Sequence, residues 1–298
     1  ATLNAAGDGQ ISDIEAVSAT TATSGVAINL ARQTEGFSIT GGAGADTINA
    51  GNGNDTINLA NGDFATGESL TGGVGTDSIV LTNATTVDFT VGTLATIETL
   101  TGSAGNDTVT LYDSQWIAFT TINLMAGTNV LNVVCSSNIT AGAIPTLTNI
   151  TTGSLTGTGG NDSATMTGAQ VDAILIGTGT INTGAGTDTL NITSTSADLN
   201  TWGATDALIS NLENVSASAA AAAVTINMSG QTEGFTITGS ANADTLTGGS
   251  GADTITGGVG ADTISAGAGN DTINLANGDW AAGESIDGGA NADGIVLT

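Results

Sequence analysis

The sequence predicts an all-β protein whose chain winds into a parallel β-solenoid, and three observations support this fold class. Glycine-rich units of nine residues follow one another directly over residues 239–274. A much longer segment recurs later in the chain. Between the glycines, runs of Thr, Ile, Val and Leu alternate apolar with polar residues, which is typical of strands with one buried face. Fixed repeats of this kind indicate stacked coils, and less regular solenoid coils are predicted between the regular blocks.

The nine-residue unit is predicted to contain a turn followed by a strand. Its four tandem copies over 239–274 read GSANADTLT, GGSGADTIT, GGVGADTIS and AGAGNDTIN, with Asp244, Asp253, Asp262 and Asp271 in equivalent places. The glycines permit the positive φ angles that a tight turn needs. In the three residues after each Asp, the central apolar side chain faces inward and its two neighbours face outward.

The long repeat indicates how many units make one coil. ISDIEAVSA (11–19) recurs as ISNLENVSA (209–217) at an offset of 198, and GNDTINLANGDF (53–64) recurs as GNDTINLANGDW (269–280) at an offset of 216. The second copy is therefore longer by 216 − 198 = 18, which is two whole units. Because two units leave every inward side chain in phase, whereas one unit would place a turn on the wrong side, a coil of two units is predicted.

The repeats divide the chain into three predicted parts. Residues 1–82 are the first copy of the long segment, with glycine–aspartate turns at 41–80. Residues 83–204 are a degenerate solenoid segment in which such units stand alone. Residues 205–298 are the second copy, which contains the tandem units at 239–274.

The composition excludes several classes of function. The chain has 28 acidic residues, Arg32 as its one basic residue, no His and a formal net charge of -27. Phosphate recognition in nucleic acids needs Lys and Arg, and His-dependent catalysis and common zinc sites need His or clustered Cys, whereas Cys135 stands alone. We therefore expect no nucleic-acid partner and no enzyme activity. No apolar run approaches the roughly 18 residues of a membrane-spanning helix, so no transmembrane segment is expected.

The acidic residues of a solenoid with stacked coils need cations from outside the chain. Equivalent aspartates of adjacent coils lie about one strand spacing apart, ~4.8 Å. Like charges at this distance repel by roughly 1 kcal/mol in water, and by more where water is excluded. Ca²⁺ accepts flexible sets of carboxylate and carbonyl oxygens and relieves this repulsion. The alternative is that the aspartates only cap turns by accepting backbone N–H groups.

The unit GGSGADTIT resembles the nonapeptide G-G-x-G-x-D-x-U-x of repeats-in-toxin (RTX) proteins. The resemblance implies a β-roll in which turns of adjacent coils hold Ca²⁺ between Asp carboxylates and backbone carbonyls. The metal ligands predicted in this way are Asp46, Asp55, Asp63, Asp77, Asp107, Asp162, Asp188, Asp244, Asp253, Asp262, Asp271, Asp279 and Asp293. The turn glycines predicted to supply backbone ligands are Gly42, Gly44, Gly51, Gly53, Gly249, Gly251, Gly258, Gly260, Gly267 and Gly269.

The predicted ligands outside the tandem units rest on weaker patterns. Asp63 and Asp279 follow the repeat aspartates Asp46 and Asp262, respectively, at a separation close to the length of one coil. Asp107, Asp162 and Asp188 stand in isolated units, where turn capping is the rival role.

Two further residues outside the repeat pattern are predicted to have packing roles. Trp280 aligns with Phe64 of the first copy and is predicted to be a packing aromatic. Cys135 lies in the apolar run LNVVCSS and is predicted to be a small buried residue, with an intermolecular disulfide as the alternative.

The long internal repeat, the small side chains and the glycine–aspartate turns resemble those of bacterial surface-layer and RTX-type exoproteins. This resemblance implies a non-enzymatic structural protein at the cell surface, outside the cell. It is expected to bind Ca²⁺ and to self-assemble through lattice or filament contacts, as bacterial surface-layer (S-layer) proteins do. The alternative is an adhesin or exopolysaccharide-binding stalk module of a larger secreted RTX protein, with a cell-surface polysaccharide as its partner. A further alternative is ice binding by Thr-x-Thr strands such as 254–256.

Overall fold

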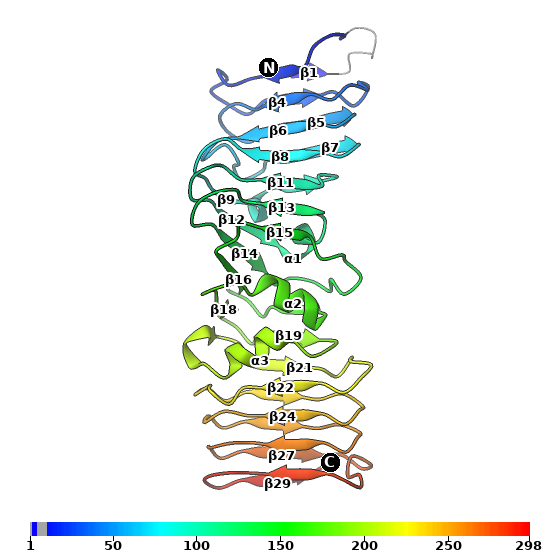
Figure 1. The fold of residues 1–298 in the computed structure, drawn as a ribbon, viewed down its shortest axis with the longest axis vertical. Helices are drawn as coiled ribbons and strands as arrows, with labels where there is room; N and C mark the ends of the chain where they lie inside the picture. The colour runs from blue at the N-terminus through cyan, green and yellow to red at the C-terminus, as the bar shows by residue number, and fades with distance from the viewer. Residues whose placement is uncertain (1, 5–10) are drawn as a thin grey trace. The chain divides into compact units, whose positions relative to one another are not determined.

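The structure is a computed structural model that describes residues 2–4 and 11–298, and short parallel strands dominate it (Figure 1). Successive strands of a sheet pair in parallel and are joined by turns, so the predicted all-β parallel solenoid is confirmed. The chain divides into two units. The first comprises Ala1–Val133 and Gly142–Thr152, and the second comprises Val134–Ala141 and Gly153–Thr298.

The strands of the first unit form three sheets. Their orders within this unit are β1-β3-β5-β7-β10, β15-β13-β11-β8-β6-β4-β2 and β9-β12-β14. The strand bounds are β1 Thr2–Asn4, β2 Ala16–Ser18, β3 Ala27–Asn29, β4 Ser38–Thr40, β5 Thr47–Asn52, β6 Thr56–Leu59, β7 Ser69–Val74, β8 Ser78–Leu81, β9 Thr86–Asp88, β10 Thr93–Ala95, β11 Thr99–Thr101, β12 Thr108–Tyr112, β13 Thr121–Asn123, β14 Val130–Val134 and β15 Thr146–Thr148. One turn of 3₁₀-helix, η2 (Phe89–Val91), and the helix α1 (Asp113–Trp116) lie between them.

The second unit is built in the same way. Its sheet orders are β16-β18-β20, β17-β19-β21-β23-β25-β27-β29 and β22-β24-β26-β28. The strand bounds are β16 Thr152–Thr156, β17 Ser163–Met166, β18 Ile181–Asn182, β19 Thr189–Ile192, β20 Ile209–Ser210, β21 Asn214–Ser216, β22 Thr225–Asn227, β23 Thr236–Thr238, β24 Thr245–Thr247, β25 Thr254–Thr256, β26 Thr263–Ser265, β27 Thr272–Leu275, β28 Ser285–Asp287 and β29 Gly294–Leu297. The helices are α2 (Gly168–Ile174), α3 (Ala197–Gly203) and the 3₁₀ turn η3 (Asp206–Leu208).

Strands of successive coils pair in phase, so equivalent side chains stack on one another. In the second unit, Ile237 pairs with Ile255 and Ile255 with Ile273, and both intervals equal two nine-residue units (255 − 237 = 18 and 273 − 255 = 18). The predicted coil of two units is therefore present here. The segment LANGD, at 59–63 and 275–279, enlarges the coil that contains it, and the interval from Ile57 to Ile79 is accordingly longer (79 − 57 = 22).

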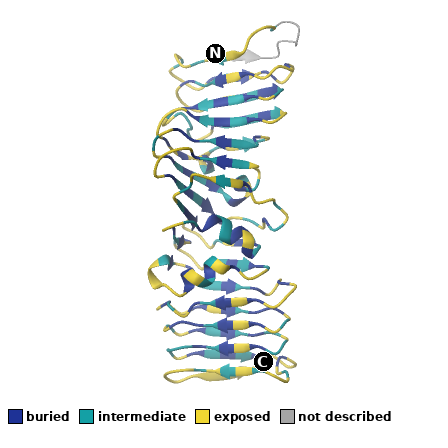
Figure 2. Ribbon diagram, viewed as in Figure 1, coloured by how far each residue is buried: buried dark blue, intermediate teal, exposed yellow. Residues whose placement is uncertain are grey.

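The core of each unit is a stack of inward-facing Ile, Leu and Val side chains. Figure 2 shows buried residues alternating with less buried ones along the strands, while the turns are exposed. In β25, for example, Ile255 is fully buried and its two Thr neighbours are of intermediate exposure. Cys135 is 2% exposed, in agreement with its predicted role as a small buried residue.

Three short α-helices interrupt the segment 83–204, where only further solenoid strands are predicted. Thr167 caps α2 by accepting the backbone N–H of Gln170, and the Gln170 side chain accepts the N–H of Thr167 at 2.8 Å, which completes a capping box. Ser196 caps α3 by accepting the N–H of Leu199 at 3.0 Å. In the part of the chain that the structure describes, no helix is long and apolar enough to span a membrane.

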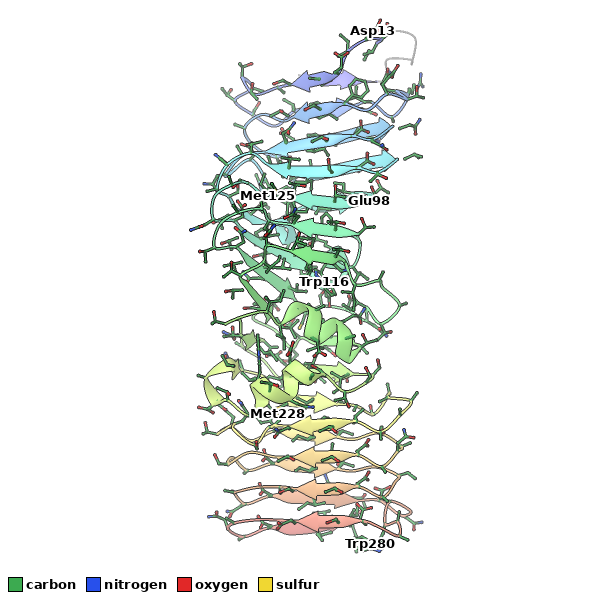
Figure 3. All side chains as sticks on the ribbon, in the orientation of Figure 1. Asp13, Glu98, Trp116, Met125, Met228 and Trp280 are labelled. Atoms are coloured by element: carbon green, nitrogen blue, oxygen red, sulfur yellow. The ribbon has the colours of Figure 1, made fainter. Side chains whose placement is uncertain are left out.

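The packing role predicted for Trp280 is wrong, because its side chain is 65% exposed (Figure 3). Its counterpart Phe64 packs edge-to-face on Phe89, with 4.8 Å between the ring centroids. Phe89 belongs to the coil that follows the one containing Phe64. Among the described residues no aromatic ring takes the corresponding place beside Trp280.

Truncating one core position tests the stack of inward side chains. We expect Ile255→Ala to lower the free energy of unfolding by about 2–5 kcal/mol. The substitution removes three buried carbons from a position that is stacked between Ile237 and Ile273 of the adjacent coils. Val259→Ala is the control, because Val259 is 57% exposed in a turn, and it should change stability by less than about 0.5 kcal/mol. Urea unfolding of both variants measures the difference, and equal effects would contradict the assigned register.

Candidate metal centre in the acidic turns

The repeat aspartates lie where a turn passes into a strand. Asp253 directly precedes β25, and its carboxylate folds back beneath Gly248, earlier in the same turn. A Cβ on Gly248 would lie 2.4 Å from Asp253 Oδ2 and 2.3 Å from the carbonyl oxygen of Ala266 in the next coil. A Cβ on Gly257 would lie 2.4 Å from Asp262 Oδ2. At position 248, glycine is required because two oxygen atoms converge in the space that a side chain would fill.

The carboxylates of successive coils are joined into continuous hydrogen-bonded chains, which we call carboxylate ladders. In one ladder of the second unit, the N–H of Phe235 donates to Asp253 Oδ1 at 2.7 Å. The N–H of Asp253 donates to Asp271 Oδ1 at 2.8 Å, and that of Asp271 to Asp293 Oδ1 at 3.1 Å. Each aspartate thus caps the strand start of the coil before it.

A second ladder of this unit runs through the alternate turns. The N–H of Val224 donates to Asp244 Oδ1 at 2.7 Å, and that of Asp244 to Asp262 Oδ1 at 2.8 Å. The ladder continues to a glutamate, because the N–H of Asp262 donates to Glu284 Oε2 at 3.2 Å.

The first unit repeats both arrangements. One ladder contains Asp55, Asp77 and Glu98, where the N–H of Asp55 donates to Asp77 at 2.8 Å and that of Asp77 to Glu98 at 2.7 Å. The other contains Asp46 and Glu68, linked by the Asp46 N–H at 3.0 Å. The two copies of the long repeat therefore carry equivalent ladders.

The isolated units of the segment 83–204 also form ladder steps. The N–H of Asp162 donates to Asp188 at 2.7 Å, and that of Asp188 donates to Glu213 at 2.8 Å. The N–H of Asp107 donates to the amide oxygen of Asn129 at 2.9 Å. Asn129 thus occupies the place that an acidic residue takes elsewhere.

Asn129 shows what surrounds the second atom of a ladder side chain. Its Nδ2 donates to the carbonyl oxygens of Leu124 at 2.9 Å, Met125 at 3.2 Å and Asn149 at 2.9 Å. A ladder Asp has an oxygen where Asn129 has this nitrogen, and an ionised carboxylate oxygen cannot donate. A cation at a ladder Asp would supply the positive charge that the amide N–H groups supply at Asn129.

Several ladder carboxylates have a buried oxygen with no hydrogen-bond partner among the described residues. These atoms are Asp55 Oδ2, Asp77 Oδ2, Asp188 Oδ2, Asp262 Oδ2, Asp271 Oδ2 and Glu284 Oε1. Leaving a charged oxygen buried without a partner is strongly unfavourable. Because these oxygens are hard ligands that lie close to backbone carbonyls, the residues present fit Ca²⁺.

Burial raises the pKa values of ladder carboxylates. Desolvation raises the pKa of Asp55 to about 6, against the hydrogen bond from Phe37, and the charge of Asp77 raises it further. Desolvation likewise raises the pKa of Glu68 to about 7, with the charge of Asp46 adding to the shift. The pKa values of Asp77, Asp253 and Asp262 are raised mainly by desolvation as well. In the absence of a cation, these carboxylates are therefore biased towards the neutral form.

The structure places eleven of the thirteen predicted aspartates in ladders. Asp63 and Asp279 lie outside them, because each accepts the N–H of a residue three positions earlier in its own loop, Ala60 and Ala276, at 2.7 Å. Both loops nevertheless lie beside a ladder, since the charge of Asp279 raises the pKa of Asp262. The ladder members are Asp46, Asp55, Asp77, Asp107, Asp162, Asp188, Asp244, Asp253, Asp262, Asp271 and Asp293.

Four glutamates and Asn129 belong to the ladders but were not predicted from the sequence. Glu68 and Glu284 occur in the tripeptide Gly-Glu-Ser after the LANGD segment of each copy. Glu98 and Glu213 follow an Ile or Leu and precede a short strand. These two recurring patterns are the sequence signal that identifies them.

The predicted turn glycines have two distinct roles. Seven of the ten adopt positive φ, namely Gly44, Gly51, Gly53, Gly258, Gly260, Gly267 and Gly269. The N–H groups of Gly42 and Gly249 donate to Oδ2 of Asp46 and Asp253 at 2.9 and 2.8 Å. In the described ranges 2–4 and 11–298, no group of three or more metal-ligating side chains gathers at one point. Carboxylates are instead distributed along the ladders, one in nearly every turn.

The fold and the acidic turns define a parallel β-solenoid with a glycine–aspartate turn in most of its coils. The family described as RTX calcium-binding nonapeptide repeat (4 copies) matches residues 38–63, 94–114 and 236–279. The search of curated proteins found no match.

The chain therefore contains RTX nonapeptide repeats of the calcium-binding type within a parallel β-solenoid. Proteins with these repeats are typically secreted, and the repeat and the solenoid indicate a structural repeat protein.

The raised pKa values predict how stability depends on pH without calcium. Because the folded-state pKa values of Asp55 and Glu68 are about 6 and about 7, against 3.8 and 4.5 for the free groups, the folded state binds more protons over this interval. Stability should therefore fall as pH rises from about 4.5 to 7 in a chelating buffer. Thermal melts at several pH values measure this. A Tm that rises over the same interval would contradict the assigned burial.

Proposed function

We propose that this chain is a non-enzymatic structural protein of the cell surface that binds Ca²⁺ along its carboxylate ladders and self-assembles into a surface layer or filament. The observation that carries the proposal is the set of buried ladder oxygens without partners, such as Asp262 Oδ2 and Asp271 Oδ2. The chain itself cannot neutralise them, since Arg32 is its one basic residue.

The ladder aspartates would hold the metal with their carboxylate oxygens, foremost those without a hydrogen-bond partner, such as Asp262 Oδ2. Backbone carbonyls of adjacent turns would complete each site. At Gly248, the carboxylate of Asp253 and the carbonyl of Ala266 already converge. Asp63 and Asp279 lie outside this arrangement, because their carboxylates cap their own loops. Bound Ca²⁺ supplies positive charge between like-charged coils, which couples metal binding to folding.

A calcium requirement suits a protein that functions outside the cell. Extracellular calcium modules bind with Kd values on the order of 10⁻⁴–10⁻³ M. Such sites fill only where Ca²⁺ is abundant, so the solenoid would become rigid after export.

The second candidate is an adhesin or exopolysaccharide-binding stalk, and the exposure of Trp280 favours it. Its indole is 65% exposed beside a hollow of about 400 Å³ that Leu275, Asn277 and Leu297 help to line. An aromatic face in such a hollow can stack on a sugar ring. Binding of the protein to cell-surface glycans on an array, lost in Trp280→Ala, would favour this function.

Replacing one ladder aspartate by asparagine tests the metal assignment. In Asp262→Asn the amide oxygen keeps the ladder bond to Asp244, and the new N–H groups can serve nearby carbonyls as those of Asn129 do. We expect higher stability than wild type in chelator and a smaller gain on adding Ca²⁺, by about 2.7 kcal/mol at a hundred times Kd. Asp13→Asn, at an exposed residue outside the ladders, is the control. Calorimetric melts with and without Ca²⁺ measure both effects, and an unchanged calcium gain in Asp262→Asn would argue against this ligand.

Self-assembly is tested on the wild-type protein by electron microscopy and analytical ultracentrifugation. We expect ordered sheets or filaments in millimolar Ca²⁺ (about the Kd of extracellular modules) and their disassembly after chelation. Mg²⁺ at the same concentration is the control for ionic strength. A single monomeric species under all conditions would contradict the assembly role and leave only the calcium binding.

A further inference from the structure

The ladder aspartates differ in what their second carboxylate oxygen, Oδ2, contacts. In one class, Oδ2 accepts the backbone N–H of the residue four positions earlier, at 2.5–2.9 Å. These closed turns pair Asp46 with Gly42, Asp107 with Ser103, Asp162 with Thr158, Asp244 with Ser240 and Asp253 with Gly249. In the other class, Oδ2 is buried and has no hydrogen-bond partner among the described residues. These open turns are those of Asp55, Asp77, Asp188, Asp262 and Asp271.

The backbone of the residue four positions before the carboxylate separates the two classes. In every open turn this residue is a glycine with a positive φ, between 93° and 119°, namely Gly51, Gly73, Gly184, Gly258 and Gly267. In the closed turns none of the corresponding residues has a positive φ, and three of them are Ser or Thr. In the left-handed conformation the N–H of this residue does not reach the carboxylate, so Oδ2 lacks its donor.

Gly184 shows why an open turn favours glycine. Its φ is +93°, and a Cβ there would lie 1.9 Å from the carbonyl oxygen of Thr158 in the coil before. Both the backbone conformation and the close approach therefore exclude a side chain at position 184. Thr158 occupies the same position in a closed turn, where its N–H and its hydroxyl both donate to the carboxylate of Asp162.

Asn129 shows what faces the second side-chain atom in a turn of the open kind. The residue four positions before it, Met125 (labelled in Figure 3), has a φ of +57°. The Nδ2 of Asn129 donates to the carbonyl oxygens of Leu124 and Met125 in its own turn and to that of Asn149 in the next coil. An open turn thus directs carbonyl oxygens, rather than an N–H, at this atom.

An aspartate in such a turn places an oxygen among oxygens. At Asp77, a Cβ on Gly72 would lie 2.5 Å from Oδ2 and 2.1 Å from the carbonyl oxygen of Thr96 in the next coil. Thr96 corresponds to Asn149, because both have a positive φ and each stands two residues before the side chain that accepts the next ladder N–H. A hard cation is the group that carboxylate and carbonyl oxygens jointly bind.

We propose that the backbone four residues before each ladder carboxylate determines where Ca²⁺ binds first, so that the open turns are the higher-affinity calcium sites and the closed turns the weaker ones. In a closed turn the N–H of this residue already stabilises the ionised carboxylate, and a cation gains less there. A positive-φ glycine admits the metal, whereas Ser103, Thr158 and Ser240 keep their turns closed. Glycine permits an open turn without enforcing it, since Gly42 and Gly249 lie in closed turns. This inference rests on the calcium binding of the proposed function and identifies the residues that select its sites.

A pair of Asp→Asn substitutions tests the division, because the two classes predict opposite results. Asp188, in an open turn, and Asp107, in a closed turn, are both 0% exposed. In Asp188→Asn the amide oxygen keeps the ladder hydrogen bond, and Nδ2 can donate to carbonyl oxygens. In Asp107→Asn either orientation of the amide sets its NH₂ group against a backbone N–H, that of Thr85 or that of Ser103. We expect the Tm in chelator to rise in Asp188→Asn and to fall in Asp107→Asn.

Calcium titration of the full chain by calorimetry, with equilibrium dialysis to count bound ions, measures the second effect. Asp188→Asn should lose one higher-affinity calcium ion per chain, whereas Asp107→Asn should keep the higher-affinity sites of the wild type. Asp162→Asn, in a closed turn that is only half-buried, gives the calcium count of a closed turn if Asp107→Asn does not fold.

Loss of a higher-affinity calcium ion in Asp107→Asn or Asp162→Asn would overturn the division into open and closed turns. An unchanged calcium count in Asp188→Asn, or a lower Tm of this variant in chelator, would overturn it as well. These outcomes leave the calcium binding of the proposed function in place. A wild-type chain that binds no Ca²⁺ would overturn the inference and the proposed function together.

Discussion

A carboxylate in nearly every turn, stacked in ladders that contain no base, is the constraint on which the rest of the structure depends. In each ladder one oxygen caps the preceding coil through a backbone N–H, as Asp271 caps the strand start at Asp253. The other oxygen has no such partner in Asp55, Asp77, Asp262 and Asp271. Hydrogen bonding therefore fixes the geometry of the turn but leaves one oxygen of each of these four carboxylates without a partner. Under the proposed function, a calcium ion would satisfy that oxygen and offset the repulsion between coils.

The same constraint explains the small side chains and the coil lengths. Gly248 must lack a Cβ because a carboxylate and a carbonyl fill its place, and Gly257 must lack one because the Asp262 carboxylate does. Coils of two nonapeptide units keep successive carboxylates in line. Each longer coil that contains LANGD contributes a glutamate to one of the two ladders, as Glu284 follows Asp262, and an aspartate to the other, as Asp293 follows Asp271. The net charge of -27 is thus the charge of the metal-free chain, reduced by two for every Ca²⁺ bound.

Much of this arrangement is predictable from the sequence, because the repeat has a fixed period. The insertion of two whole units in the second copy predicts that Ile237, Ile255 and Ile273 stack, and the nonapeptide identifies eleven ladder aspartates. The ladder glutamates are harder to predict, since their units lack the glycine pattern. Their role is recognised only from the hydrogen bond that each accepts from an Asp N–H of the adjacent coil. Helices α2 and α3 begin at the caps Thr167 and Ser196. Because Thr and Ser are common throughout this sequence, these two caps do not stand out as helix starts. The exposure of Trp280 depends on which coil covers it, which no local pattern specifies.

The ionisation state of the ladder aspartates tests this account most directly. Carbon-13 NMR of the side-chain carboxyls of Asp55 and Asp262 would follow their titration with and without Ca²⁺. The account predicts that Asp55 titrates near its raised pKa of about 6 in chelator, and that both carboxyls remain ionised with shifted resonances once Ca²⁺ is bound. Titration of Asp55 near its ordinary pKa of 3.8, unchanged by Ca²⁺, would contradict it.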